Sequence, residues 1–458
     1  MQNRLKYYMG ILLVTTSIAV VSYSDDYPKS KEEPYATDLL SVKITNAGAD
    51  GKTVVDGTVD EDNKMVSFPR LDTLTNFLAL NVDAKVSEGA QLSQSVFDFS
   101  MAPDESSKTL LLRVTNHTRY KDYFIKVRKN IPVFGADFEN PIVYNFSGDS
   151  IYSTFKSLLT RGAAFDGKQV LIVTRENTGP HVLKVSDLEK GIISPVRLDL
   201  TGVSGGTFAY NEGALCGGHI YIASLAGSQA SPLKIYYWDT PISVPQTIAN
   251  IDLASISGTG SRYGDNMSVD LDPAGNGYIY FGDNASKTIL RLKVSGYKTV
   301  DSPTVLGSSS EATAFMNINL VPESGQYVWS GVRTPIMLTD EMGNIKYSMQ
   351  KDYIAAEAID PRIFTFNKER YLIVCTAGLG SASTTVQEAM ETFDNATNHN
   401  PDYSFALGGM GNSAPSAQTG YYVEKDEAGN DSILYIFGAR ADSGFMISKF
   451  PIKQQTDN

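Results

Sequence analysis

The stretch Met267–Ser295, MSVDLDPAGNGYIYFGDNASKTILRLKVS, decides the fold predicted for this chain. It contains three runs with the two-residue periodicity of β-strands, separated by polar turns at Pro273–Asn276 and Asp283–Ser286. Three consecutive antiparallel strands that recur about every 45–60 residues indicate a β-propeller. We therefore interpret this stretch as one propeller blade.

Counting outward from this copy gives six repeats, each recognised by its second and most apolar strand. Third and outer strands follow most of them. The fifth copy is the weakest, because Ser381–Asn400 has the composition of an insertion that is partly helical. The six second strands are Val170–Thr174, Ile220–Ser224, Tyr278–Gly282, Tyr327–Gly331, Tyr371–Thr376 and Ile433–Gly438.

The ends of the repeat region predict how the ring closes. The last copy runs out of chain near Ile452, before any fourth strand, and Pro141–Phe146 is an extra strand ahead of the first copy. Pairing these two segments would protect both open sheet edges. We expect a six-bladed propeller over residues 131–458, closed by strand 141–146, with seven blades as the alternative.

The turn Asp272-Pro273-Ala274-Gly275-Asn276 resembles the Asp-Pro-x-Gly-Asn turn of NHL and related propeller repeats. In the other five copies the resemblance is limited to the spacing of the strands. It implies a propeller fold, and it implies no activity, because propellers carry many unrelated functions.

The region before the propeller reads as three segments. Residues 1–23 have the basic start and short apolar stretch of a signal peptide, too short to span a bilayer. They resemble Bacteroidetes lipoprotein signals, but Tyr23 stands where the lipidated Cys would be. Residues 24–37 are a charged linker. Seven short strands in residues 38–130 predict an Ig-like β-sandwich, similar to the modules that open many Bacteroidetes surface proteins.

Composition narrows the classes of partner. The formal net charge of −12, with no basic run, excludes a nucleic-acid-binding footprint. The two cysteines, Cys216 and Cys375, lie in apolar stretches far apart in sequence. Their surroundings favour buried free thiols over a disulfide, and neither has the spacing of a metal site. The signal peptide implies export to the periplasm, the outer-membrane surface or the medium.

The turns that follow second strands, and those that lead into first strands, meet around one mouth of a propeller channel. In this chain they carry several arginines, which bind carboxylate or sulfate groups bidentately. Tyr263 could stack on a sugar ring. The alternative is that these arginines pair with nearby acids as solvated charges. The candidate ligand-binding residues are Arg161, Arg175, Glu176, Glu212, Arg262, Tyr263, Asp265, Asn266, Asp283, Asn284, Arg333, Glu357 and Arg440.

An enzyme would need a pair of carboxylates at that mouth, and Glu176, Glu212, Asp265 and Glu357 are the candidates. Sialidases combine an arginine cluster with a Tyr nucleophile on a six-bladed propeller. Their Ser-x-Asp-x-Gly-x-Thr-Trp turn is absent from this sequence. No cofactor motif is found. A structural Ca²⁺ at Asp270-Leu271-Asp272 is the one metal hypothesis, against a solvated hairpin.

These observations favour an exported protein that binds a glycan or another small acidic ligand at the channel mouth, alongside surface proteins of polysaccharide uptake. Catalysis is not favoured. A glycoside hydrolase or lyase, and a protein-binding scaffold, are the alternative hypotheses.

Overall fold

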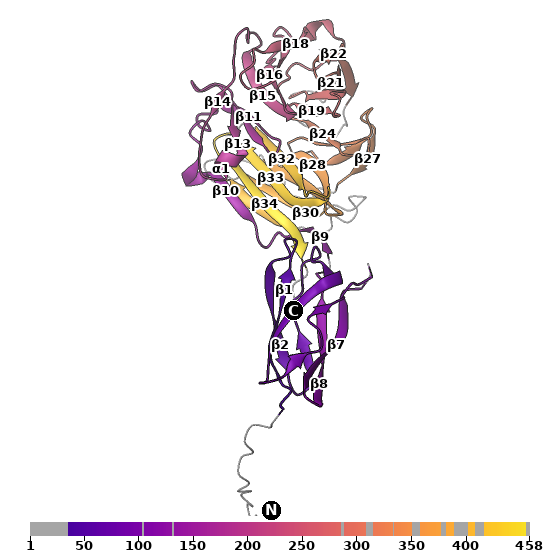
Figure 1. Ribbon diagram of the computed structural model, residues 1–458. Helices are drawn as coiled ribbons and strands as arrows, with labels where there is room; N and C mark the ends of the chain where they lie inside the picture. Colours follow the sequence, from indigo (N-terminus) through magenta and orange to yellow (C-terminus); the bar gives the residue numbers. More distant parts are fainter. Residues whose placement is uncertain are drawn as a thin grey trace, which may run out of the picture. The chain divides into compact units, whose positions relative to one another are not determined.

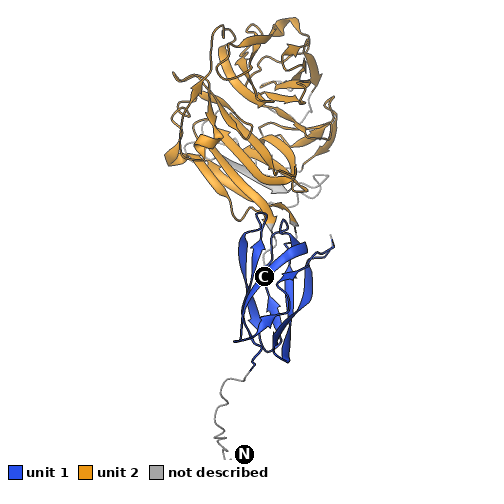
Figure 2. Ribbon diagram, viewed as in Figure 1, with its two compact units in different colours: residues 1–131, 456–458 blue, residues 132–455 orange. Residues whose placement is uncertain are grey.

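The computed structural model describes residues 35–102, 105–130, 132–284, 288–307, 315–332, 334–349, 358–376, 382–388, 402–407 and 416–454. The protein is all-β and has two compact units, residues 1–131 with 456–458 and residues 132–455 (Figure 2). The expected signal peptide and most of the expected linker lie outside the described residues. Within the described residues, no helix has the length and apolar character needed to cross a membrane.

Unit 1 consists of eight strands joined edge to edge in the order β5-β7-β8-β3-β2-β1-β4-β6. All neighbours are antiparallel except β3 and β8, which are parallel. Side chains that alternate along the strands, including Ile44, Leu112 and Ile125, form one core. Phe77–Ala79 is a 3-10 helix (η1) before β4. The strands are β1 (Leu39–Ala47), β2 (Thr53–Asp60), β3 (Met65–Ser67), β4 (Leu80–Val86), β5 (Gln91–Leu92), β6 (Val96–Phe97), β7 (Ser107–Asn116) and β8 (Arg119–Arg128).

Five sheets of unit 2 are built from consecutive strands, in a propeller-like arrangement (Figure 1). Apolar side chains from the faces of neighbouring sheets form the cores between them, as Leu171, Ile222 and Trp238 do. Each sheet begins with one of the strands β11 (Thr160–Phe165), β15 (Phe208–Cys216), β19 (Ser268–Leu271), β24 (Asn317–Val321) and β28 (Ala358–Phe366).

The strands that follow within these five sheets are β12 (Gln169–Thr174), β13 (His181–Lys184) and β14 (Val196–Arg197); β16 (His219–Leu225), β17 (Leu233–Trp238) and β18 (Gln246–Ile251); β20 (Gly277–Gly282), β21 (Thr288–Ser295), β22 (Thr299–Val300) and β23 (Thr304–Gly307); β25 (Gln326–Ser330), β26 (Met337–Thr339) and β27 (Ile345–Ser348); β29 (Glu369–Thr376), β30 (Ala382–Glu388) and β31 (Tyr403–Leu407). The short helices are η2 (Gly148–Ser150), α1 (Val185–Leu188) and η3 (Leu253–Ser255).

A sixth sheet joins the two ends of unit 2. Its strands are β32 (Ala417–Lys425), β33 (Asp431–Arg440), β34 (Gly444–Gln454) and β10 (Ile142–Ser147), with β9 (Pro132–Ala136) also paired to β34. β10 runs antiparallel to β34 over six residue pairs, from Ile142 opposite Lys449 to Ser147 opposite Gly444. Phe146 stacks on Phe445 with ring centroids 4.8 Å apart. The strand that precedes the first repeat thus completes the last sheet.

One local expectation is wrong. Within Ser381–Asn400, which was expected to be partly helical, residues Ala382–Glu388 form strand β30. It pairs with β29 on one side and β31 on the other. The run ASTTVQE is rich in Thr and Val, which favour strands, but it lacks the large apolar residues that mark the other blades. The rest of that segment lies outside the described residues.

The Asp-x-x-Gly-Asn turn occurs at three places, although the sequence analysis recognised only one of them. It spans Asp272–Asn276, Asp340–Asn344 and Asp426–Asn430. In each turn the Asp Oδ1 accepts backbone N–H bonds from the residues two and four positions later, at 2.8–3.0 Å. The Gly has a φ of 78–85°, which side-chain-bearing residues rarely adopt. These Asp residues therefore shape hairpins.

Candidate functional site

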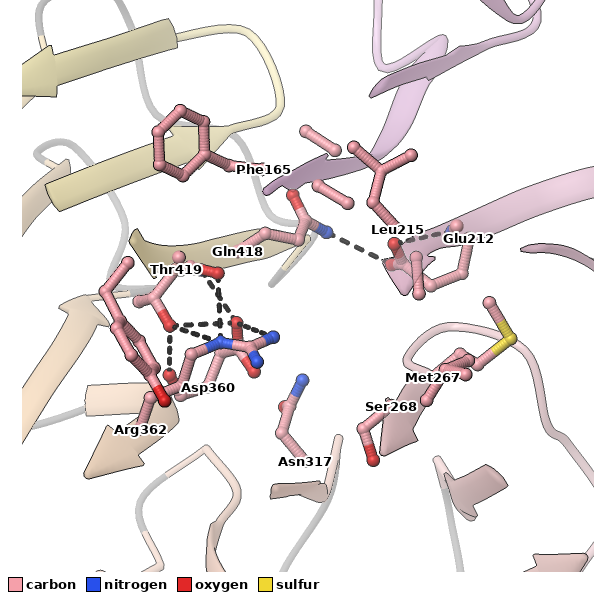
Figure 3. Close-up of a pocket in the computed structure, with 17 residues that line it drawn as sticks. Phe165, Glu212, Leu215, Met267, Ser268, Asn317, Asp360, Arg362, Gln418 and Thr419 are labelled. Atoms are coloured by element: carbon pink, nitrogen blue, oxygen red, sulfur yellow. Dashed lines mark hydrogen bonds and ion pairs between the residues drawn. The ribbon is translucent and has the colours of Figure 1, made fainter. Parts of the chain in front are cut away.

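A cavity lies where the innermost strands of unit 2 meet. Its walls come from all six of them: β11, β15, β19, β24, β28 and β32 (Figure 3). About 80 Å³ is open to a water-sized sphere. One water needs ~10–15 Å³ by this measure, so the cavity holds a few waters but has no space for a sugar ring. A larger ligand would have to bind at a mouth of this channel.

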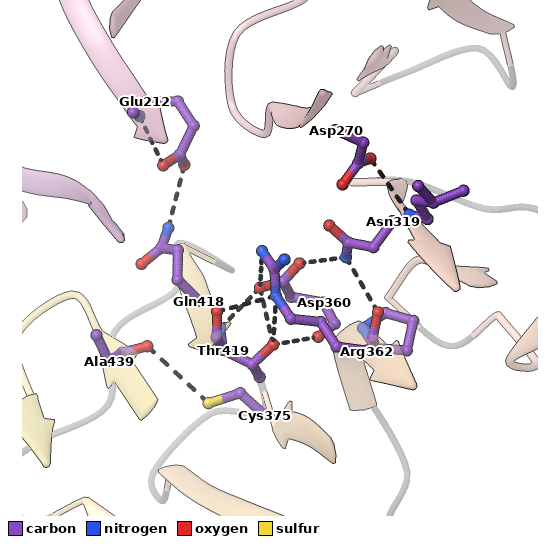
Figure 4. A network of polar contacts seen from close by, with 12 residues as sticks. Glu212, Asp270, Asn319, Asp360, Arg362, Cys375, Gln418, Thr419 and Ala439 are labelled. Carbon is purple, nitrogen blue, oxygen red and sulfur yellow. Dashed lines mark hydrogen bonds and ion pairs between the residues drawn. The ribbon is translucent and has the colours of Figure 1, made fainter. Parts of the chain in front are cut away.

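Asp360 ties three of these strands together inside the channel (Figure 4). It stands in a bulge of β28 and accepts bonds from Asn319 Nδ2 of β24 at 2.9 Å and from Thr419 N of β32 at 2.7 Å. Arg362 Nη2 lies 3.7 Å from its Oδ2, and Arg362 Nε donates to the Thr419 carbonyl at 3.0 Å. Because Asp360 is buried, this full set of partners is what makes its charge tolerable.

Asp270 of β19 faces the same network, and its pKa is raised. Its Oδ2 accepts the Leu320 N–H at 3.2 Å. Burial raises the pKa of Asp270 to about 6, although the positive charge of Arg362 opposes the shift. Asn319 points toward Asp270 in Figure 4, and its buried Oδ1 has no hydrogen-bond partner among the described residues. A protonated Asp270 would offer that oxygen a donor.

Glu212 of β15 closes the channel toward the arginine-bearing mouth. Its Oε1 accepts the Gly213 N–H at 3.0 Å, and its Oε2 accepts from Gln418 Nε2 at 3.1 Å. The same Gln418 nitrogen donates to the Arg161 carbonyl at 2.9 Å. Burial raises the pKa of Glu212 well above its usual value, and the negative charges of Asp360 and Asp265 add to the shift.

Three arginines gather around one buried carboxylate at this mouth. Arg262 binds Asp265 bidentately, with Nε 2.6 Å from Oδ2 and Nη2 3.0 Å from Oδ1. Arg161 Nη2 lies 3.8 Å from Asp265 Oδ1. The charge of the third, Arg175, also acts on this group, since Arg161, Asp265 and Arg262 all perturb its pKa. The Asp265 side chain is only 1% exposed, whereas that of Arg262 is 36% exposed.

Arg175 is fixed between an amide and an aromatic ring. Its Nη2 donates to Asn211 Oδ1, and its guanidinium carbon lies 3.5 Å from the ring centroid of Phe208. Asn211 Nδ2 in turn donates to the Gly264 carbonyl at 2.6 Å, next to Asp265. An added Cβ at Gly264 would lie 2.2 Å from the Ser224 carbonyl oxygen, so this close approach requires glycine.

Several candidate residues from the same loops have structural roles. Tyr263 was expected to stack on a sugar, but it is fully buried, with its hydroxyl bonded to the Gly260 N–H and to Thr288 Oγ1 at 2.8 Å. The Asn266 amide binds both the N–H and the carbonyl of Gly282. Asp283 Oδ1 accepts the Arg262 N–H at 3.3 Å, and the Asn284 N–H donates to the Arg262 carbonyl. These residues shape the loop that presents Arg262.

Of the remaining candidates, Arg440 and Glu176 lie in the described part of the chain. Arg440 is fully buried at the end of β33 and offers no surface to a ligand. Glu176 is half-buried in the turn after β12, and its N–H donates to Thr174 Oγ1. Arg333 and Glu357 lie outside the described residues.

The suggested Ca²⁺ site is not formed by its two carboxylates. Asp272 Oδ1 is occupied by backbone N–H groups of its own turn, while Asp270 binds the Leu320 N–H in the channel. In the described part of the chain, no group of three or more His, Cys, Asp or Glu residues could hold a metal ion. Both cysteines are free thiols, and burial raises the pKa of Cys216 to about 11, which makes it unreactive.

The sequence interpretation missed the channel residues Asp270, Asn319, Asp360, Arg362, Gln418 and Thr419 as a group. One signal was available: polar residues interrupt innermost strands, such as Asn319 in β24 and Asp360 in β28, where these strands line the channel. Phe208 was missed because a single aromatic residue at the start of a strand carries no distinctive pattern.

The family of this chain emerges from comparison with known domains. The model of the DUF4623 family, described as a domain of unknown function, matches residues 25–453. The chain belongs to this family. It is similar to a DUF4623 protein of known crystal structure from Bacteroides eggerthii DSM 20697, at 51% identity and a TM-score of 0.69, over 92% of this chain and 100% of that one. This relative fits the expected resemblance to uncharacterised Bacteroidetes proteins.

Weaker similarities extend to other solved structures. One is to a putative oxidoreductase (glucose dehydrogenase) from Thermus thermophilus, at 11% identity and a TM-score of 0.35, over 68% of this chain and 100% of that one. Another is to the WD40 β-propeller domain of Doa1, at 11% identity and a TM-score of 0.36, over 80% and 98% of the two chains. A comparison with curated proteins finds no match.

Proposed function

We propose that unit 2 binds an acidic saccharide through the group formed by Arg161, Arg175 and Arg262 at the channel mouth. The observation that carries this proposal is that Arg262 and Arg161 lie 2.6 and 3.8 Å from one buried carboxylate, that of Asp265, whose charge also acts on the partly buried Arg175. In a protein with a net charge of −12, such a local excess of positive charge favours an anionic ligand. A carboxylate or sulfate group would complete the charge balance.

The state of two of the arginines supports an anion site. Burial lowers the pKa of Arg175 to about 10, and the neighbouring charge of Arg161 contributes to the shift. Burial also lowers the pKa of Arg161. The Nε atoms of both residues are buried and have no hydrogen-bond partner among the described residues. A bound anion would stabilise both charges and accept from these donors.

Binding is favoured over catalysis by the condition of the carboxylates. Both oxygens of Glu212 are engaged, by Gly213 and Gln418, and Asp265 is held by Arg262. Neither is open to act on a substrate. The buried hydroxyl of Tyr263 excludes it from the nucleophile role that a sialidase-like mechanism requires.

The experiment that tests this function is calorimetric titration of the full chain with methyl glucuronide, galacturonate oligomers and inorganic sulfate. Arg161→Gln should weaken the binding of each of these probes by about 10- to 100-fold, because a charge-assisted hydrogen bond contributes about 1.5–3 kcal/mol. Arg197→Ala, at an exposed arginine of β14, is the matched control. Binding that Arg161→Gln leaves unchanged would reject the proposal.

The architecture around the site is also a proposal. We propose that unit 1 is an Ig-like spacer, since its mostly antiparallel strands enclose one core without a disulfide. We propose further that the chain is exported and that its propeller is NHL-like, which the recurrent Asp-x-x-Gly-Asn turns support. Fractionation of a Bacteroides culture that expresses the chain tests export; retention in the cytoplasm would reject it.

A further inference from the structure

An exposed aromatic ring adjoins the arginine group. Phe208 is the first residue of β15 and is 43% exposed, although it belongs to an innermost strand whose later residues are buried or half-buried. The guanidinium of Arg175 covers one face of its ring at 3.5 Å. Because Arg175 covers this face, the exposure of the residue comes from the rest of the ring and from its backbone.

The position of this ring relative to the arginines is fixed by a chain of contacts. Phe208 contacts Arg175, Arg175 binds Asn211, and Asn211 Nδ2 binds the Gly264 carbonyl at 2.6 Å. Gly264 precedes Asp265, the carboxylate that Arg262 and Arg161 share. An apolar surface and a cluster of cationic donors are thus held side by side, the combination that orients a ligand with one flat face and one charged end.

We infer that Phe208 is a specificity-determining residue and that the ligand is a six-membered ring bearing a carboxylate. The ring would lie on the exposed face of Phe208, and the carboxylate would reach the arginines. This inference rests on the proposed function and takes the place of the stacking role expected for Tyr263, which is buried. The shared chemistry fits a pyranose uronate or an aromatic acid.

The test compares ring-bearing and ringless anions on the full chain by calorimetry or ligand-observed NMR. The probes are methyl glucuronide, benzoate, acetate and inorganic sulfate. Phe208→Ala should weaken the ring-bearing ligand by about three- to tenfold, the range expected for loss of one aromatic contact, and should leave acetate and sulfate unchanged. Phe208→Tyr keeps the ring and should bind as the unsubstituted protein does. Thermal unfolding of both variants verifies that they are folded.

The outcomes separate the alternatives. If Phe208→Ala weakens the binding of methyl glucuronide, the ligand is a sugar acid. If it weakens only the binding of benzoate, the ligand is an aromatic acid. Either result supports the stacking role of Phe208. An equal loss for acetate and for the ring-bearing ligands would overturn it, because Phe208 would then act only by holding Arg175. If Arg161→Gln changes the binding of no anion, sulfate included, the proposed function itself is rejected, independently of Phe208.

Discussion

The guanidinium of Arg262 holds the carboxylate of Asp265 by two hydrogen bonds, at 2.6 and 3.0 Å, although Asp265 is almost completely buried and Arg262 is not. The pair fixes the loop that carries both residues at the channel mouth. It also places one negative charge among three arginines. The balance of charge at the mouth therefore depends on Asp265.

Asp265→Asn should lower the stability of the fold. It should also make that stability increase more strongly when an anion is added. Removing one partner of a fully buried ion pair costs about 3 kcal/mol, and we expect a smaller loss here because the Arg262 side chain is 36% exposed. The substitution also leaves Arg262 and Arg161 without the counter-charge of Asp265. We expect sodium sulfate to recover more stability in this variant than in the unsubstituted protein, as measured by urea unfolding at fixed ionic strength. Asp301→Asn, at an exposed carboxylate, is the control. Equal stability of the two variants would contradict this role of Asp265.

The stability of unit 2 should depend on the protonation of Asp270. Its pKa of about 6 in the folded state lies above the ordinary value of 3.8, so folding takes up a proton between these pH values. This contribution is fully present below pH 3.8 and is lost as pH rises through 6, by up to about 3 kcal/mol. The charged groups that act on Asp270 include Arg362 and Asp360 of β28. The charge of Asp270 in turn raises the pKa of the neighbouring phenols of Tyr280, Tyr327 and Tyr421, which are neutral over this pH range.

Asp270→Asn isolates that contribution from the other titrating groups. Its amide does not titrate, so the variant should gain stability relative to the unsubstituted protein as pH rises from about 5 to about 8. Chemical unfolding at several pH values measures the difference. A difference that stays constant over this range would show that Asp270 does not take up a proton on folding.

Gly162→Ala should be destabilising because Glu212 lies directly against Gly162. A Cβ at this position would be 2.5 Å from Glu212 Oε1, 2.9 Å from its Cα and 3.0 Å from the Gly213 nitrogen. Two of these atoms belong to the backbone and cannot move aside, so we expect a loss of about 1–3 kcal/mol. Gly307→Ala is the control, since nothing lies within 4 Å of its added Cβ. Similar melting temperatures for the two variants would argue against this packing of β11 on β15.

Phe146→Ala tests the closure of the sixth sheet. Phe146 of β10 is buried against Phe445 of β34, and truncating a buried Phe costs about 3–5 kcal/mol. Val143→Ala, on the same strand at a side chain 43% exposed, should cost far less. If both substitutions reduced the unfolding free energy equally and slightly, the pairing of β10 with β34 would not be needed for stability.

The sequence predicted strands where apolar periodicity is strong and missed features that depend on side-chain direction. The second strands could be located because they are packed on both faces, as Val170–Thr174 and Ile433–Gly438 are. Strand β30 was missed because its Thr-rich run lacks that apolar signal. Loop residues were the least predictable: Arg262 and Tyr263 are adjacent, yet one is at the mouth and the other is buried. Glu212 and Gln418, 206 positions apart in the chain, meet only when the last sheet packs beside the first ones.

The most direct measurement is a crystal structure of the protein grown with saturating methyl glucuronide. We expect electron density at the channel mouth, with the carboxylate within hydrogen-bond distance of Arg161 or Arg175 and the pyranose ring over Phe208. Ligand bound elsewhere on unit 2, or an empty mouth at a concentration that saturates binding in solution, would contradict it.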